Sequence, residues 1–142
     1  MPLKNVLRKA TPVLVVDRIE PVLAFWEKLG VLPTVQVPDG EATDGRLAFV
    51  ILAAAGIEVM YQTSASTRAD LVKSATLKEV FRTEPQQVTL YVDVSSLADI
   101  ERALAAERLI MPRRTTPYGA TEAGYLEPAG NIVVFAEHGA PQ

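Results

Sequence analysis

The sequence predicts an α+β fold in which two βαβββ repeats form a curved eight-stranded mixed sheet around a cleft, with the helices outside. Three observations predict this fold: an internal repeat, the same order of strand and helix patterns in both halves, and a turn-rich hairpin near the end of the chain. Residues 11–26 align with residues 89–104 at an offset of 78. Because neither half could bury its sheet alone, we expect the halves to pack together.

The first repeat, about residues 10–63, begins with a β-branched strand at 11–16. Apolar residues then recur at three- and four-residue spacing, which is typical of a helix, with Asp17 as the expected N-cap and Gly30 at the end. Trp26 lies on this apolar stripe, so we expect it in the core rather than against a ligand. Further strands are predicted at 31–37, 46–52 and 57–62.

A helical connector is expected at about 64–85, because apolar residues alternate with charges there between Ser or Thr caps and the Glu84-Pro85 pair. The second repeat covers about 86–138. Its predicted elements are a strand at 87–94, a helix on Leu97 and Leu104 capped by Ser95 or Ser96, a strand that begins at 109, a loop at 113–119, a final hairpin and a tail at 139–142.

Composition narrows the class of protein. The 142 residues are one domain's worth, so we expect a single domain over 1–142. There is no cysteine, hence no disulfide framework and no thiolate ligand. A net charge of −3 without a basic stripe argues against nucleic acid as a partner. The longest apolar run, 47–57, falls short of the ~18 residues of a membrane span. No signal peptide is apparent, so a cytoplasmic protein without a membrane partner is expected.

The final hairpin carries the clearest local pattern. Pro128-Ala129-Gly130-Asn131 is a run of turn residues, and the strand after it, 131–137, is too apolar for an exposed edge, so we expect it in the middle of a sheet. This hairpin, Ala24-Phe25-Trp26 in the first helix and Ile57-Glu58-Val59 in the fourth strand occur in an order and spacing that resemble the glyoxalase/bleomycin-resistance/dioxygenase (vicinal oxygen chelate) superfamily. The resemblance covers roughly residues 10–138.

Metal-using members of that superfamily carry ligands at four strand positions. Carried over one at a time, these positions are Thr11, Glu58, Gln87 (Thr89 if counted by the internal repeat) and Val134. They offer one carboxylate and one amide, whereas a catalytic divalent site needs about three firm protein ligands. The one histidine, His138, falls in the predicted tail, where a surface position is expected. We therefore expect a metal-depleted member with no metal and no cofactor.

The candidate ligand-binding residues are Glu58, Gln87, Thr89, Tyr91, Tyr118 and Val134. Glu58 is the leading contact, since an acid in an apolar strand is unusual, and it is the only carboxylate predicted to face the cleft. Arg46 and Tyr61 are its possible partners, although alternation puts Tyr61 out of phase with it. Partial burial of Glu58 would raise its pKa and suit it to act as a base. Tyr118 is placed at the cleft rim with Arg113 and Arg114.

These residues favour a metal-free protein that binds and sequesters a small molecule in an enclosed cleft. The resemblance implies a homodimer with ligand sites between subunits. The alternative is a metal-independent lyase, isomerase or hydrolase-type enzyme with Glu58 as the catalytic base. A metal-dependent glyoxalase or dioxygenase is the third hypothesis and fits the ligand count worst.

Overall fold

The computed structural model describes residues 1–139, so the expected tail lies, beyond Gly139, outside the described residues. The two halves have the same element order. The first contains β1 (Val13–Val16), α1 (Glu20–Glu27), β2 (Leu32–Pro38), β3 (Leu47–Ala54) and β4 (Ile57–Thr63). The connector contains α2 (Ser64–Leu71) and α3 (Ala75–Val80). The second half contains β5 (Thr89–Asp93), α4 (Leu97–Ala103), β6 (Arg108–Thr115), β7 (Ala120–Leu126) and β8 (Ile132–His138).

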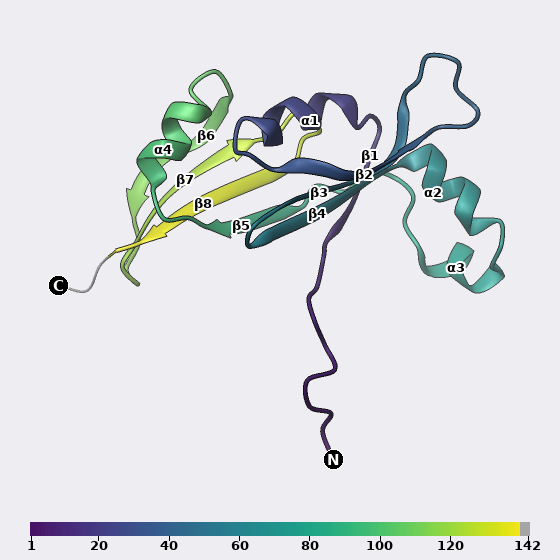
Figure 1. Cartoon of the computed structure of the whole chain (residues 1–142), viewed down its shortest axis with the longest axis horizontal. Helices are drawn as coiled ribbons and strands as arrows, with labels where there is room; N and C mark the ends of the chain where they lie inside the picture. The colour runs from purple at the N-terminus through teal and green to yellow at the C-terminus, as the bar shows by residue number, and fades with distance from the viewer. Residues whose placement is uncertain (140–142) are drawn as a thin grey trace.

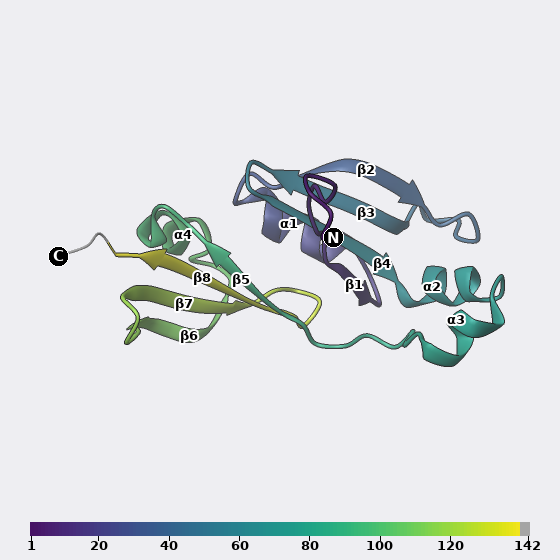
Figure 2. The same cartoon turned by 90° about the horizontal axis from the view of Figure 1, so that it is seen from below.

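The eight strands form two four-stranded mixed sheets, which confirms the predicted α+β class and its two βαβββ repeats. The strand orders are β1-β4-β3-β2 and β5-β8-β7-β6. In each sheet the first strand of the repeat pairs in parallel with the last, and the other neighbours are antiparallel. β8 therefore lies inside its sheet, as its apolar sequence predicted. The two sheets lie side by side along the length of the molecule (Figure 2).

The helices of the two repeats cover the same side of the paired sheets (Figure 1). α1 and α4 both lie above the strands in this view, whereas residues 1–10, here called the N-terminal arm, leave the body on the opposite side. α2 and α3 lie beyond the end of the N-terminal sheet (Figure 1). None of the helices within residues 1–139 is long and apolar enough to cross a membrane.

The first helix begins later than its expected cap. α1 starts at Glu20 after Ile19, which makes no side-chain capping bond, so the prediction of Asp17 as N-cap is wrong. Asp17 lies too far before the first turn to reach its free N–H groups. Gly30 does follow the helix with φ of +77°, a conformation that favours glycine. Trp26 is fully buried on the helix face that packs on the sheet, as expected.

The connector is broken into two helices, where the sequence predicted one. The Thr63 side chain accepts a hydrogen bond from the Ser66 N–H and caps α2, and the Ser74 side chain caps α3 by accepting from the Leu77 N–H. Ser74 has extended backbone angles, so the chain leaves the helical path there before starting again. The residue types of the caps, serine and threonine, were predictable from the sequence. The position of the break was not, because several serines and threonines in this segment could have capped a helix.

The predicted loop at 113–119 is partly strand. β6 continues to Thr115, with Arg114 opposite Glu122 and Thr115 opposite Thr121 in β7. Register shifts occur on either side of Met111, and Pro112, which lacks an N–H donor, follows directly. In the sequence, the arginines and threonines of this exposed edge strand are typical of a loop. They adopt strand conformation because they pair with β7.

A buried chain of hydrogen bonds crosses between the two halves. The Trp26 Nε1–H donates to the Tyr61 hydroxyl oxygen at 3.0 Å, and that hydroxyl donates to Glu127 Oε2 at 2.6 Å. All three side chains are at most 1% exposed. Burial, with the Glu127 carboxylate beside it, raises the pKa of Tyr61 far above its usual range. Because Glu127 belongs to the second repeat, these bonds join the halves within the shared apolar core.

Candidate functional site

The candidate site lies on the side of the sheets away from α1 and α4. In β4, Val59, Tyr61 and Thr63 are buried on the helix side, so alternation places Glu58 and Met60 on the other side. Tyr61 is therefore out of phase with Glu58, as the sequence indicated. The N-terminal arm leaves the body on the side away from α1 and α4 (Figure 1), and its Lys9 bonds to Glu58.

Glu58 is held by two residues that precede β1. Lys9 Nζ donates to Glu58 Oε2 at 2.8 Å, and Thr11 Oγ1 donates to Oε1 at 2.5 Å. The hydrogen bond from Lys9, followed by that from Thr11, lowers the pKa of Glu58 below its usual 4.5, against the opposing effect of burial. The expectation of a raised pKa is thus wrong, because the charged form has an ammonium and a hydroxyl as partners.

The prediction that Arg46 or Tyr61 is the partner of Glu58 is also wrong. Arg46 pairs with Asp44, two residues before it, at 3.1 Å. Tyr61 faces the core and donates to Glu127. Lys9 and Thr11 replace them because residues 9–12 run beside β4, where the Met60 N–H donates to the Pro12 carbonyl at 2.9 Å.

A second carboxylate, Glu122 of β7, forms the centre of a polar cluster on the C-terminal sheet. It accepts hydrogen bonds from the hydroxyls of Tyr91 at 2.8 Å and Tyr118 at 2.6 Å, and from the Arg114 guanidinium at 3.3 and 3.4 Å. Its side chain is only 2% exposed. We call Tyr91, Arg114, Tyr118 and Glu122 the Glu122 cluster.

The sheet register brings the Glu122 cluster together. Arg114 in β6 lies directly opposite Glu122, and Tyr91 in β5 lies two strands away across β8. Tyr118 reaches the carboxylate from the turn between β6 and β7. The hydrogen bonds of Tyr118, then Tyr91, hold the pKa of Glu122 below its usual 4.5. The same bond to Glu122 raises the pKa of Tyr91 well above its usual range.

Glu122 was missed in the sequence, where Glu58 was expected to be the only carboxylate on this face. The signal was present, because Glu122 stands in a strand of small and apolar residues, as Glu58 does. Strand alternation alone did not fix the side on which it lies. Pairing of Glu122 with Ala136 and of Gly124 with Val134 places these residues on one face.

Two neighbouring cavities adjoin Glu58. One, of about 190 Å³, is lined by Pro12 and Glu58 from the first half and by Leu90 and Tyr91 from the second. It brings two predicted ligand residues, Glu58 and Tyr91, from separate repeats to one space. The other, of about 340 Å³, is lined by Lys9, Ala53 and Glu58 among others.

A larger cavity of about 370 Å³ lies elsewhere on the seam between the halves. Its walls include Trp26, Phe135 and Ile100, and none of the predicted ligand residues. Its carboxylates are already paired, Asp99 with Arg102 and Asp93 with His138. We place the candidate site at Glu58 and Tyr91 instead, because there a cavity meets the residues that carry the chemistry.

The remaining predicted residues lie apart from these cavities. Gln87 precedes β5, and its amide donates to the Gly130 carbonyl at 3.0 Å. Thr89 is exposed at the start of β5 opposite Ile132. Val134 is partly buried in β8 opposite Tyr91. The structure therefore joins Glu58, Tyr91 and, through Glu122, Tyr118, but it does not bring Gln87, Thr89 or Val134 to the same cavity walls.

The four family metal positions do not fit a divalent ion in this chain. Glu58 already has an ammonium as a neighbour, Thr11 donates its hydroxyl to the same carboxylate, Gln87 offers a single amide oxygen, and Val134 has no donor atom. Within residues 1–139 no group of three or more His, Asp or Glu side chains is placed to hold a metal. About three such ligands are needed.

His138 is not in a tail, contrary to the prediction. It is the last residue of β8, its Nδ1 is 3.0 Å from Asp93 Oδ1, and its ring lies edge-on to Tyr91 with 6.4 Å between centroids. It is exposed, as expected. Its position near Tyr91 follows from the parallel pairing of β5 with β8.

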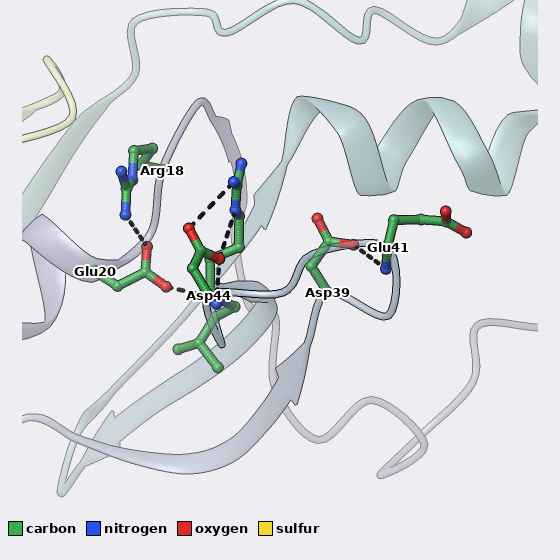
Figure 3. A network of polar contacts seen from close by, with 7 residues as sticks. Arg18, Glu20, Asp39, Glu41 and Asp44 are labelled. Atoms are coloured by element: carbon green, nitrogen blue, oxygen red, sulfur yellow. Dashed lines mark hydrogen bonds and ion pairs between the residues drawn. The ribbon is translucent and has the colours of Figure 1, made fainter.

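Another polar network fixes the loop between β2 and β3 (Figure 3). Asp44 is bound by the Arg46 guanidinium, Asp39 accepts the Glu41 N–H at 2.9 Å, and Glu20 accepts the Leu47 N–H at 2.6 Å. These carboxylates serve local backbone and arginine donors. We therefore assign the network to loop structure rather than to the candidate site.

Comparison with known proteins gives structural neighbours only. No family model matches the chain, and no curated protein matches it in sequence. A glyoxalase/bleomycin resistance protein/dioxygenase from Nocardioides superimposes with a TM-score of 0.64 at 19% identity, covering 97% of this chain and 91% of its own. A bleomycin-binding protein complexed with bleomycin gives 0.60 at 15% identity, covering 94% and 100%.

A bleomycin resistance determinant encoded on the transposon Tn5 gives a TM-score of 0.63 at 15% identity, again covering 94% of this chain and 100% of its own. Identities this low establish architecture and leave ligand and chemistry open. The superfamily resemblance drawn from the sequence is thus confirmed for the fold. This chain has the paired βαβββ fold of the glyoxalase/bleomycin-resistance/dioxygenase proteins.

Proposed function

We propose that this protein is a metal-free, cytoplasmic binding protein that sequesters a small molecule on the Glu58 side of its sheets. The observation that carries the proposal is the cavity shared by Glu58 of the first repeat and Tyr91 of the second. An aromatic wall with a few fixed polar groups is the usual composition of a small-molecule site. The Glu122 cluster extends this polar surface beyond Tyr91.

The environment of Glu58 supports binding over catalysis. A general base works best with a pKa near the working pH, and the hydrogen bonds from Lys9 and Thr11 hold the pKa of Glu58 below its usual value. A carboxylate kept charged suits recognition of a donor group on a ligand. This weighs against the alternative of a metal-independent lyase, isomerase or hydrolase with Glu58 as base.

A thermal-shift screen tests the proposal. Cationic antibiotics including bleomycin, small 2-oxo acids and aromatic metabolites are added to wild type, Glu58→Gln and the exposed control Glu79→Gln. A specific ligand at 100 times its Kd stabilises the native state by about 2.7 kcal/mol. We expect the hit to lose affinity in Glu58→Gln and to keep it in Glu79→Gln. An equal shift in all three proteins would refute the assignment of the site, and turnover of the ligand that falls about 10²-fold in Glu58→Gln would favour the enzyme.

The homodimer is part of the same proposal. The edge strands β2 and β6 expose apolar side chains, among them Leu32, Val35 and Leu109 at 42–48% exposure. An exposed edge strand with apolar side chains is a template for pairing with another chain, and a second copy of this chain is the occupant we propose. Light scattering should give twice the 15.4 kDa of the chain. Val35→Asp should shift this toward monomer, whereas Val72→Asp in the connector should not.

A further inference from the structure

The N-terminal arm is attached to the body of the protein at one ion pair. All ten of its residues are exposed, and Lys9 is the only one whose side chain hydrogen-bonds to another described residue. Lys9 Nζ lies 2.8 Å from Glu58 Oε2, with the two side chains 65% and 19% exposed. Figure 1 shows the rest of the arm extending away from the strands.

The arm also contributes to the walls of both cavities that adjoin Glu58. Ala10, Gly56, Ile57 and Glu58 line both of them, and Lys9 lines the larger. Movement of Lys9 together with Ala10 would open the part of the wall that Ala10 contributes to both cavities. The joined space would fall within the ~300–1,000 Å³ typical of small-molecule sites, whereas the smaller cavity with Tyr91 is below that range at about 190 Å³.

We propose that the N-terminal arm is a latch, in which Lys9 occupies the place of a ligand's protonated amine on Glu58. A cationic ligand binds by displacing Lys9, and the arm then leaves the cavity wall. This inference rests on the proposed function, because it assigns the ligand class and the control of the same site.

Three features of the contact support exchange of one ammonium for another. The Lys9–Glu58 pair is largely exposed on the lysine side, and exposed ion pairs contribute little to stability, so its release is not prohibitive. Thr11 donates to the other carboxylate oxygen, and it keeps Glu58 oriented when Lys9 leaves. A neutral ligand that displaced Lys9 would leave a partly buried carboxylate without its cation, which favours amines over neutral analogues.

The test uses dansylcadaverine, an aromatic probe with a primary ammonium, and N-butyl dansylamide as its neutral counterpart. Fluorescence titrations compare wild type, Lys9→Met, the matched arm variant Lys4→Met, and Glu58→Gln. We expect Lys9→Met to bind dansylcadaverine about 1.5- to fivefold more tightly than wild type, the range that release of an exposed ion pair allows. Lys4→Met should match wild type, and Glu58→Gln should bind this probe more weakly than either.

Trypsin cleavage after Arg8 and Lys9 gives a second readout. Saturating dansylcadaverine should speed cleavage of the wild-type arm, whereas N-butyl dansylamide should not. The latch is overturned if Lys9→Met and wild type bind the amine equally, if Lys4→Met gains as much, if Glu58→Gln binds as well as wild type, or if no variant binds the amine. In the last case binding of neutral ligands in the thermal-shift screen would leave the proposed function standing, and a screen without any hit would remove both.

Discussion

Replacement of Tyr61 by phenylalanine tests the buried chain of hydrogen bonds that joins the halves. The variant keeps the ring and removes the hydroxyl that donates to Glu127 at 2.6 Å and accepts from Trp26 at 3.0 Å. Glu127 retains the backbone N–H groups of Ala129 and Asn131 as donors. The change thus removes two side-chain bonds at a site that water does not reach.

The expected loss follows from the two groups that are left behind. A hydrogen bond to a charged group contributes about 1.5–3 kcal/mol, and a buried donor without a partner costs about 1–3 kcal/mol. Since both bonds share one hydroxyl, the two losses are coupled rather than additive, and we expect the free energy of unfolding to fall by about 2–4 kcal/mol. Domains of this size have a total of about 5–15 kcal/mol.

Urea denaturation followed by the fluorescence of Trp26, the single tryptophan, measures the loss directly. With a slope of about 1–3 kcal/mol per molar urea, the midpoint should fall by about 1–2 M. Tyr125→Phe is the matched control, because Tyr125 is also buried, its hydroxyl makes no hydrogen bond with the described residues, and that hydroxyl is not one of the buried polar atoms left without a partner. It should change stability by less than about 0.5 kcal/mol. Equal losses in the two variants would refute the assignment of a stabilising chain across the seam.

Three further predictions address the second repeat and the proposed absence of a metal. The pKa of Glu122 is lowered in the folded state, so its contribution to stability is present above pH 4.5 and is lost as the pH falls from there through the folded pKa. The difference in Tm between wild type and Glu122→Gln should therefore shrink over that interval, and Glu79→Gln is the control. Gly130 has φ of +95°, so Gly130→Ala should cost about 1–2 kcal/mol in urea denaturation, whereas Gly40→Ala, where φ is not positive and an added Cβ meets nothing, should cost less. Incubation with EDTA should leave the Tm of the purified protein unchanged, and a fall that zinc or manganese reverses would contradict a metal-free site.

Much of the fold was predictable because it depends on local patterns. Apolar spacing located α1 and α4, and Ser96 caps α4 as its residue type predicted. The turn residues before β8 and its apolar content placed that strand inside a sheet. Two element boundaries were predicted wrongly, the helix break before Ser74 and the extension of β6 to Thr115. Both depend on which backbone hydrogen bonds form among several that the sequence allows.

The candidate site was less predictable, because its contacts join residues far apart in the chain. Glu58 was found as an isolated acid in an apolar strand, but its partner Lys9 lies 49 residues away. Glu122 carried the same signal and was missed, since its side of the sheet became clear only from its pairing with both neighbouring strands and its bond to Tyr91.

The sequence by itself determined two similar units, each with an apolar stripe on its helix, and it identified Glu58 as an isolated acid in an apolar strand. Only the tertiary structure decided that Lys9 would neutralise this acid, that Tyr61 would bond to Glu127 across 66 residues, and that Tyr91 would face the cavity of Glu58. Propensity and periodicity act over a few residues, whereas these contacts depend on strand register and on how the two halves pack.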